Sequence, residues 1–328
     1  MSALNKLPVL KNRIVRTYQK TVYGRRHPDW DRVPEALRET ARRNEYLAAN
    51  PYPVEQIVRE FKATPFVTPQ TPIVTMGSCF AQELDKWLKK HQYNVLKNVW
   101  GAVFSPQSFS QIIHYSFETA SWTPDELFWV MDGKYRNPYV KGSTGEPAYL
   151  GQTEAEARDA LQQHYQQSRD LLSQAEVAVW TLGLTESWRN KRDHKCYFAL
   201  PFAQVYRPEL HEFHNLSYED VVNHLEYAIT TYKKHNPGIQ FILSVSPVPL
   251  QVSFREHLGP YVATQYSKSV LHAAAMRMAE QYDYVFYMPS FEITRSNPTV
   301  NYQADGRHVN DACVEAIMDA FKQMYVLA

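Results

Sequence analysis

The sequence predicts an α/β protein: a three-layer α/β/α sandwich built on a mainly parallel sheet of five strands. Two observations lead to this prediction. Short apolar runs rich in β-branched residues alternate with longer segments whose apolar residues recur at helical spacing. Strands that alternate with helices form βαβ units, and such units place helices on both faces of an open parallel sheet.

Each apolar run has the length of a strand that is buried on both faces of a sheet. The five expected strands are residues 73–76, 94–99, 177–182, 241–246 and 284–288. Directly after the first run, Phe80, Leu84 and Leu88 recur at helical spacing while charged residues fill the other face. Further helices are expected over residues 153–174, 218–235, 265–282 and 310–325.

Two long, aromatic-rich segments, residues 118–150 and 187–216, interrupt this alternation. We expect a main domain over residues 67–328 that carries both as insertions. Residues 1–66 are expected to form a basic, helical extension. Because residues 1–26 hold seven lysines and arginines and no acidic residue, two interpretations stay open. They form a solvated arm, or they contact anionic lipid at a membrane surface.

The composition limits the classes of partner and the location. Acidic and basic residues nearly balance, 34 against 35, so the whole chain is not suited to neutralising nucleic acid. No apolar run is long enough to span a membrane, and the first thirty residues lack the apolar stretch of a signal peptide. The three cysteines are far apart, which argues against a disulfide framework or a zinc site. We expect a cytoplasmic protein, with peripheral membrane contact through residues 1–26 left open.

The first candidate for chemistry is the turn Gly77-Ser78-Cys79, which follows the first expected strand. It places a hydroxyl and a thiol at the amino end of the next helix. Backbone N–H groups and the positive end of the helix dipole can activate a nucleophile there and stabilise an oxyanion. A Gly-Ser pair at this position can equally be an ordinary helix cap.

The second candidate is Asp305-Gly306-Arg307-His308, which precedes the last expected helix. A nucleophile needs a base, and the base needs a carboxylate that orients it. Asp305 and His308, separated by two residues on one loop, can supply both.

A family resemblance joins these two candidates. Residues 77–81 spell GSCFA, and four later blocks follow in order: 100–106 (WGAVFSP), 181–188 (TLGLTESW), 244–249 (SVSPVP) and 267–271 (SKSVL). From residue 72 to the end, the chain therefore resembles the GSCFA family, whose members look like SGNH hydrolases. The resemblance implies a flavodoxin-like α/β/α fold and an active site more clearly than it implies a substrate.

Carried over to this chain, the SGNH pattern implies particular roles for matching residues. The nucleophile lies in the 77–79 turn, His308 is the base, and Asp305 orients it. The backbone N–H of Gly101 and the loop Gly183-Leu184-Thr185 are expected to hold the oxyanion. This chain has Thr185 where the pattern has a side-chain amide, which is a shorter donor. Glu186 either binds substrate or caps the following segment.

The identity of the nucleophile depends on the alignment of the turn. When Gly77 is matched to the glycine of the SGNH turn Gly-Asp-Ser, the nucleophile is Cys79; when serine is matched to serine, it is Ser78. We favour Cys79, because the tight turn off the strand fixes the position of the glycine. A thiol is the better nucleophile at neutral pH, and a Cys-His pair transfers acyl groups readily. The alternative use of Cys79 is as a small buried apolar residue.

Two further features admit both a binding and a structural interpretation. Lys268 either contacts a carboxylate or phosphate of the substrate or lies on the surface of a helix. The aromatic residues of the two insertions either form a platform for sugar rings or pack the long loops.

The sequence thus predicts an SGNH-type esterase or O-acyltransferase that needs no metal or cofactor. Its expected substrate is an acylated small molecule, and among these a carbohydrate or surface-polysaccharide precursor is favoured. One alternative is a catalytically silent carbohydrate-binding or scaffold protein of polysaccharide biosynthesis, which the substitution of Thr185 favours. Another is a membrane-surface adaptor that uses residues 1–26. The oligomeric state is left open.

Overall fold

The computed structural model describes residues 51–327 of the chain. The basic segment 1–26 and most of the helical extension expected over residues 1–66 lie outside the described residues. The described residues form one compact unit, and the short helix α3 (Val54–Arg59) contributes its Ile57 to the core of this unit.

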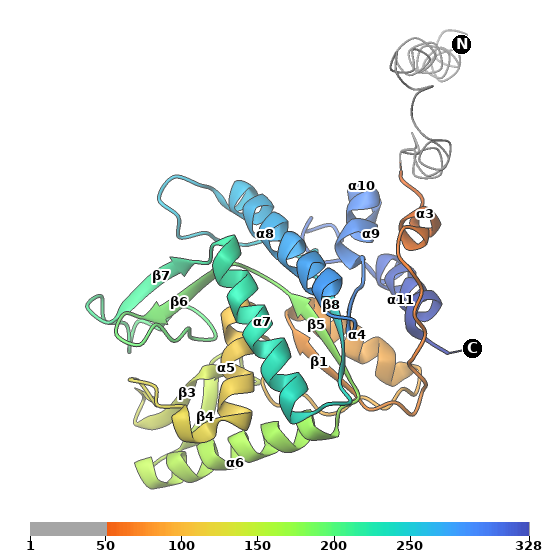
Figure 1. Cartoon of the computed structure of the whole chain (residues 1–328). Coiled ribbons are helices and arrows are strands. Elements are labelled where there is room, and N and C mark those ends of the chain that lie inside the picture. Colours follow the sequence, from red (N-terminus) through yellow and green to blue (C-terminus); the bar gives the residue numbers. More distant parts are fainter. Residues whose placement is uncertain (1–50, 328) are drawn as a thin grey trace, which may run out of the picture. The chain divides into compact units, whose positions relative to one another are not determined.

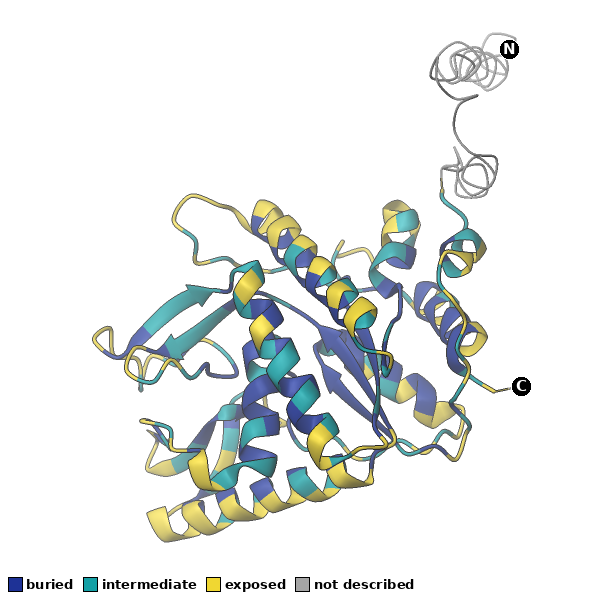
Figure 2. Cartoon of the chain, viewed as in Figure 1, coloured by how far each residue is buried: buried dark blue, intermediate teal, exposed yellow. Residues whose placement is uncertain are grey.

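A parallel sheet of four strands forms the centre of the fold (Figure 1). The strands are β1 (Ile73–Gly77), β5 (Val177–Leu182), β8 (Gln240–Val245) and β9 (Val285–Tyr287). They pair in the order β1-β5-β8-β9. β1, β5 and β8 are buried almost throughout, as expected of short apolar strands covered on both faces (Figure 2).

The prediction of a fifth strand at residues 94–99 is wrong. The backbone at Asn94 and Leu96 bonds to Ile73 on β1, with N–O distances of 2.9 and 2.8 Å, but the pairing stops there. The side-chain amide of Asn98 instead donates to the backbone carbonyl oxygens of Thr75 and Gly101. An amide that bonds to the edge of β1 takes the place of a continued backbone ladder, so this segment is an irregular edge.

Helices cover both faces of the sheet (Figure 1). Alternate strand residues point to opposite faces. Val179 and Ile242 belong to the core cluster that includes residues of α4 (Cys79–Lys90) and α11 (Asp311–Tyr325). Trp180 and Phe241 belong to the larger cluster on the other face. The helices of that face are α5 (Pro106–Phe117), α6 (Glu154–Gln174), α7 (Tyr218–His235) and α8 (Pro260–Gln281). The three-layer α/β/α prediction is confirmed, with four strands in place of five.

Both aromatic-rich segments contain small antiparallel sheets. The first carries β2 (Trp129–Met131), β3 (Lys134–Lys141) and β4 (Pro147–Gly151). The second carries the hairpin of β6 (Glu186–Asn190) and β7 (His211–Asn215). Buried Glu126 joins the two segments, because it accepts hydrogen bonds from the Tyr197 hydroxyl and from His211 Nε2. The aromatic residues therefore pack the insertions together as well as lining a pocket described below.

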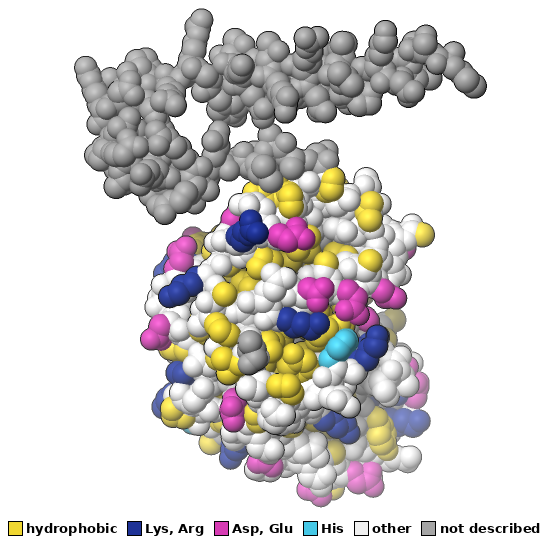
Figure 3. Space-filling model, turned by 90° about the vertical axis from the view of Figure 1, so that its right-hand side faces the viewer, with side chains coloured by type: hydrophobic (Ala, Val, Ile, Leu, Met, Phe, Trp, Pro, Cys, Tyr) yellow, Lys and Arg dark blue, Asp and Glu magenta, His cyan; other side chains and the backbone are white. Residues whose placement is uncertain are grey.

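The remaining helices are short, and one face of the molecule carries charges of both signs. The 3-10 turn Thr119–Ser121 follows α5, and α9 (Ser290–Ser296) and α10 (Pro298–Asn301) follow β9. On the face shown in Figure 3, basic and acidic side chains lie interspersed. Among residues 51–327, no helix is long and apolar enough to cross a membrane.

Candidate active site

The turn after β1 can be built only with glycine at its first position. Gly77 has a φ of +151°, and a Cβ atom there would lie 2.2 Å from Oγ1 and 2.5 Å from the carbonyl oxygen of Thr181 on β5. The carbonyl oxygen of Gly77 accepts the N–H of Val103 at 2.7 Å, which attaches the 100–106 segment to the turn. The sequence block WGAVFSP thus lies beside GSCFA in space.

Ser78 and Cys79 have different roles in this turn. Ser78 is the N-cap residue of α4: its Oγ accepts the N–H of Phe80 at 3.3 Å, and the residue is only 4% exposed. Cys79 is the first residue of the helix, is partly exposed, and is a free thiol. The helix-cap interpretation therefore describes Ser78, and Cys79 is the side chain that a substrate could reach.

Asp305 and His308 form the expected pair. Oδ2 of Asp305 lies 2.5 Å from Nδ1 of His308, and Oδ1 accepts the backbone N–H groups of Arg307 and His308 at 2.9 and 3.0 Å. These bonds, led by the one from Arg307, hold the pKa of the Asp305 carboxyl well below its usual range. A carboxylate on Nδ1 places the proton of a neutral ring there, so Nε2 is left as the basic atom.

The His308 ring is open to a further hydrogen bond. The His308 side chain is 44% exposed, and Asp305 is its only hydrogen-bonding partner among residues 51–327. The ring therefore makes no hydrogen bond to Ser78 or Cys79 in this structure. Hydrogen bonds of this kind are often long in the absence of substrate and tighten in its presence.

The helices that follow the two halves of the site pack against each other. α4 begins at Cys79, and α11 begins at Asp311, three residues after His308. Nε1 of Trp87 on α4 donates to Glu315 of α11 at 2.8 Å. Phe80 and Val309, which adjoin the two candidate catalytic residues, belong to one core cluster. Packing on this face of the sheet thus connects the helix that follows Ser78 with the helix that follows His308.

Gly101 has its backbone N–H occupied. That N–H donates to Oδ1 of Asn98 at 3.1 Å, and the same oxygen accepts the N–H of Trp100 at 2.8 Å. Gly101 has a φ of +67°, and a Cβ atom there would lie 2.5 Å from the carbonyl oxygen of Lys141. The oxyanion role expected for Gly101 stays a prediction that requires the bond to Asn98 to open.

The backbone N–H groups of the loop Gly183-Leu184-Thr185 also have hydrogen-bond partners in the protein. The N–H groups of Gly183 and Leu184 both donate to the carbonyl oxygen of Phe104, at 3.0 and 2.9 Å. The Thr185 hydroxyl is fully buried, donates to Asn215 at 2.8 Å and lies 2.7 Å from the Ser267 hydroxyl. The side chain that replaces the expected amide therefore holds the hairpin and α8 in place.

Lys268 is buried rather than on the surface of a helix. It is 2% exposed on α8, and its Nζ donates to the carbonyl oxygen of Gly183 at 2.7 Å. Burial lowers the pKa of this ammonium group to about 7. The contact holds the loop after β5 against α8.

Glu186 contacts the loop between β8 and α8 and does not cap a helix. It begins β6 and accepts the Ser253 hydroxyl at 2.9 Å. It also forms an ion pair with Arg255, with an N–O distance of 3.3 Å. Both partners lie in residues 247–259, the segment between β8 and α8, which we call the cover loop.

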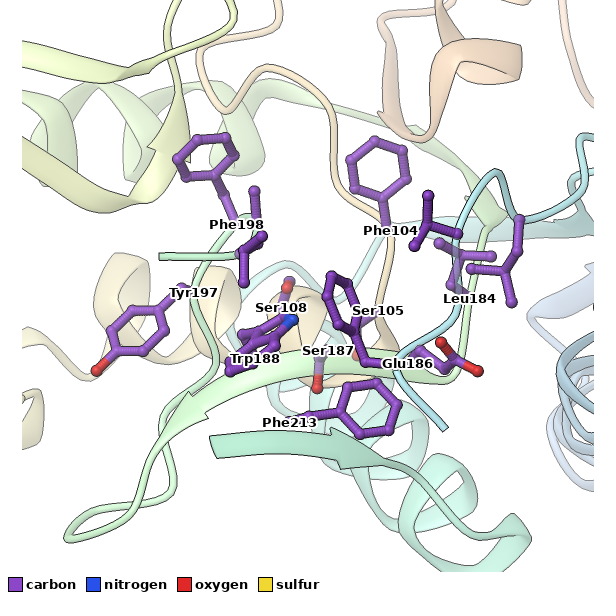
Figure 4. A pocket seen from close by; sticks show the side chains of 15 residues that line it. Phe104, Ser105, Ser108, Leu184, Glu186, Ser187, Trp188, Tyr197, Phe198 and Phe213 are labelled. Carbon is purple, nitrogen blue, oxygen red and sulfur yellow. The ribbon is translucent and has the colours of Figure 1, made fainter. Parts of the chain in front are cut away.

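An aromatic pocket of about 180 Å³ lies beneath the cover loop (Figure 4). Its walls come from the 100–106 segment, the β6–β7 hairpin with its connection, and the cover loop itself. The aromatic side chains that line it are Phe104, Trp188, Tyr197, Phe198, Phe213 and Phe254. Buried polar atoms without partners, Ser187 Oγ and Trp188 Nε1, belong to lining residues. A mostly apolar cavity with a few polar groups is suited to an organic substrate.

Several residues of the site carry no signal of their own in the sequence. Asn98, Ser253 and Ser267 are common polar residues, and only their contacts in the fold give them a role. Within residues 51–327 there is no group of three or more His, Cys, Asp or Glu side chains that could hold a metal ion.

Comparisons with known proteins give one family and several distant structures. The model of the GSCFA family matches residues 72–321. No curated protein matches the chain in sequence. One similar solved structure is a Streptococcus pneumonia protein described as a platelet activating factor. It is 11% identical, with 82% of this chain and 89% of that chain covered and a TM-score of 0.38.

Two further similar structures are family 3 carbohydrate esterases. The one from Clostridium thermocellum is 10% identical, with 78% and 94% of the two chains covered and a TM-score of 0.30. The one from Talaromyces cellulolyticus is 9% identical, with 77% and 94% covered and a TM-score of 0.29.

Proposed function

The chain belongs to the GSCFA family, and from this premise we propose that it is an ester hydrolase or O-acyltransferase that works through Cys79, His308 and Asp305. The observation that carries the proposal is the Asp305–His308 pair. Its carboxylate occupies Nδ1, its Nε2 has no partner among the described residues, and the ring is exposed. A histidine arranged in this way is oriented for general base catalysis.

The first half of the reaction forms an acyl-enzyme. His308 Nε2 takes the proton of the Cys79 thiol, and the sulfur attacks the carbonyl carbon of the ester. The C–O bond to the alcohol then breaks, and the alcohol oxygen receives the proton from His308. The product is a thioester on Cys79 and a free alcohol.

The second half releases the acyl group. His308 takes a proton from water or from an acceptor hydroxyl, whose oxygen attacks the thioester carbonyl. The C–S bond breaks, and the thiolate recovers the proton. Water as the acceptor gives hydrolysis, whereas a sugar hydroxyl gives acyl transfer.

Charge on the carbonyl oxygen needs hydrogen-bond donors during both halves. The first backbone N–H groups of a helix have no partner within the helix, and Cys79 is the first residue of α4. Its N–H is the donor best placed by the local geometry. Asp305 stays ionised and stabilises the positive charge that His308 carries while it holds a second proton.

The aromatic pocket favours a carbohydrate ester as substrate. Its rings offer flat apolar faces to sugar rings, and the serine hydroxyls and the Trp188 N–H offer hydrogen bonds. These features support the carbohydrate part of the proposal independently of the catalytic pair.

Acyl-enzyme trapping tests the proposal. The whole chain is incubated with p-nitrophenyl acetate, and intact mass is measured over time. We expect one acetyl adduct in the wild-type protein and in Ser78→Ala, and none in Cys79→Ala. His308→Ala should slow adduct formation at least 100-fold. Cys196→Ala is a matched control, because Cys196 is a free thiol that is fully buried. An adduct that persists in Cys79→Ala, or a rate unaffected by His308→Ala, would overturn the mechanism.

A silent carbohydrate-binding protein is the second candidate, and one observation favours it. The N–H groups of Gly101 and of the 183–185 loop are all engaged, so the helix N-terminus is the main source of oxyanion donors. This function predicts saturable binding of sugars in the aromatic pocket with no acyl-enzyme in any variant. The same mass measurements, combined with sugar titration, distinguish the two.

A further inference from the structure

A second cavity, of about 290 Å³, borders the loop that carries the catalytic pair. Its walls come from the amino-terminal half of α8, from α9, from the start of the cover loop and from residues 302–306. Gly306, which lies between Asp305 and His308 in the chain, is one of the lining residues. The cavity therefore lies next to the proposed reaction site and is lined largely by residues other than those of the aromatic pocket.

The charge of this cavity is one-sided. Lys268 on α8 and Arg295 on α9 both line it, and no lining residue is acidic. Neither cation forms an ion pair with a residue of the described chain. The acidic residue nearest to Arg295 in the sequence is Glu292, which is engaged by the Tyr287 hydroxyl and by His272. Asp305 already accepts three hydrogen bonds from Arg307 and His308.

The bonding of Lys268 is also incomplete. An ammonium group has three donors, and the only hydrogen bond that Lys268 makes with residues 51–327 goes to the carbonyl oxygen of Gly183. Burial of a cation without a counter-charge is costly, and proteins usually avoid it by pairing the charge. A cation that is 2% exposed, lines a cavity and has no carboxylate partner is suited to an anion from outside the protein.

Polar groups of the lining can complete such a site. Thr264 and Gln265 lie one turn before Lys268 on α8, and Tyr302, whose side chain hydrogen-bonds with Arg295, also lines the cavity. The Tyr302 hydroxyl donates to the carbonyl oxygen of Pro247 at 3.0 Å, which fixes the ring at the rim. The guanidinium of Arg295 can bind a carboxylate or phosphoryl group through two parallel hydrogen bonds.

We propose that this cavity is an anion subsite, in which Lys268 and Arg295 bind a carboxylate or phosphoryl group of the ester substrate or of the acyl acceptor. The inference rests on the proposed function for its placement beside His308. It adds that the substrate is acidic: an acylated uronate or an acylated sugar phosphate in place of a neutral sugar ester.

Equilibrium binding tests the subsite without requiring catalysis. Glucuronate, glucose 6-phosphate and glucose are titrated calorimetrically at constant ionic strength into the Cys79→Ala protein, which cannot form the proposed acyl-enzyme. We expect at least one of the two anions to bind at least tenfold more tightly than glucose. The tighter of the two anions identifies the preferred group, carboxylate or phosphoryl.

Variants of the two cations then assign the binding to this cavity. Arg295→Gln and Lys268→Met, each added to Cys79→Ala, should weaken the binding of the anion at least tenfold. Lys134→Met is the matched control, because Lys134 is exposed at the start of β3, away from the cavity, and should change nothing. Circular dichroism of each variant checks the fold. Arg295→Gln serves as the decisive variant if removal of the buried lysine impairs folding.

The outcomes for the subsite and for the enzyme are separable. Glucose binding as tight as that of both anions, or anion binding unchanged in folded Arg295→Gln, overturns the subsite even if wild-type protein forms an acyl-enzyme. Anion binding that depends on Arg295 supports the subsite even if no acyl-enzyme forms, and in that case the catalytic proposal alone fails.

Discussion

Gly77 lies so close to Thr181 on the neighbouring strand that a Cβ atom at position 77 would be 2.2 Å from Thr181 Oγ1. The two residues are register partners in the β1–β5 pairing. Because a side chain cannot fit there, the chain leaves β1 tightly against β5. The thiol of Cys79 is thereby held at the carboxyl end of the sheet, where loops from several strands converge.

Gly77→Ala is therefore expected to destabilise the fold strongly. The clash involves backbone as well as side-chain atoms of Thr181, so it cannot be relieved by a rotamer change alone. We expect a loss of about 3 kcal/mol or more in the free energy of unfolding, measured by urea denaturation. Gly133→Ala is the matched control: Gly133 has a φ of +71° with open space around it, so only backbone strain of about 1–2 kcal/mol should appear. Equal losses in the two variants would contradict the argument.

The alternation of apolar runs and helical patterns was sufficient to predict the central sheet. A strand covered by helices on both faces must be apolar along its whole length, and this leaves a clear signal in the sequence. β5 occurs at the predicted residues, and β1, β8 and β9 differ only at their ends. The segment 94–99 (NVLKNV) holds three polar residues and stays an edge, because the amide of Asn98 competes for the carbonyl oxygen of Thr75. Such local competition has no periodic signal.

Contacts within the candidate site were predictable where the two residues are close in the chain and not where they are distant. Asp305 and His308 are three residues apart, and a loop can join them directly. Thr185 contacts Ser267, which is 82 residues away in the sequence, and Lys268 contacts Gly183, which is 85 residues away. Contacts of this length depend on how α8 lies on the sheet. For this reason the burial of Lys268 and the structural use of Thr185 could not be derived from the sequence.

Replacement of Asp305 should reduce catalysis without harming the fold. In Asp305→Asn an amide replaces the carboxylate, so the negative charge that stabilises the protonated ring is lost and the wrong tautomer of His308 is favoured. We expect kcat for ester hydrolysis to fall on the order of 10²–10⁴-fold, with KM little changed. The melting temperature should stay close to that of the wild type, because both side chains are more than 40% exposed. Asp311→Asn, at the exposed start of α11, is the control and should retain full activity.

Glu186→Gln should loosen the cover loop over the aromatic pocket. The variant loses the charge that pairs with Arg255 and weakens the bond to Ser253. Phe254, which packs edge-on against Trp188 at 5.2 Å between ring centroids, should then be less tightly held. We expect faster amide hydrogen exchange in residues 250–257 and a several-fold higher KM.

Glu212→Gln is a suitable comparison for this variant. Glu212 forms an ion pair with Arg189 on the same β6–β7 hairpin. Its replacement therefore removes a similar interaction but leaves the contacts of the cover loop intact. If both variants change exchange in residues 250–257 equally, Glu186 does not hold the loop specifically.

Lys268 should make the stability of the protein depend on pH. Burial lowers its pKa to about 7 in the folded chain, whereas the pKa in the unfolded chain is near 10.5. Between these two values the unfolded state binds more protons than the folded state, so the free energy of unfolding rises as pH increases from about 7 to 10. Below pH 7 both states are protonated, and the folded protein carries the full cost of the buried charge.

Lys268→Met isolates this contribution, because methionine fills a similar volume without a charge. We expect the variant to be more stable than the wild type at pH 6 and to lose this advantage as pH rises towards 9, in urea unfolding at matched ionic strength. Burial also raises the pKa of tyrosines such as Tyr165, but this affects both proteins alike and only at higher pH. Stability curves that stay parallel between pH 6 and 9 would show that the lysine is not held in a low-dielectric site. In that case there would be no cost of charge burial at Lys268 for a bound anion to offset. The measurement therefore tests the subsite as well as the fold.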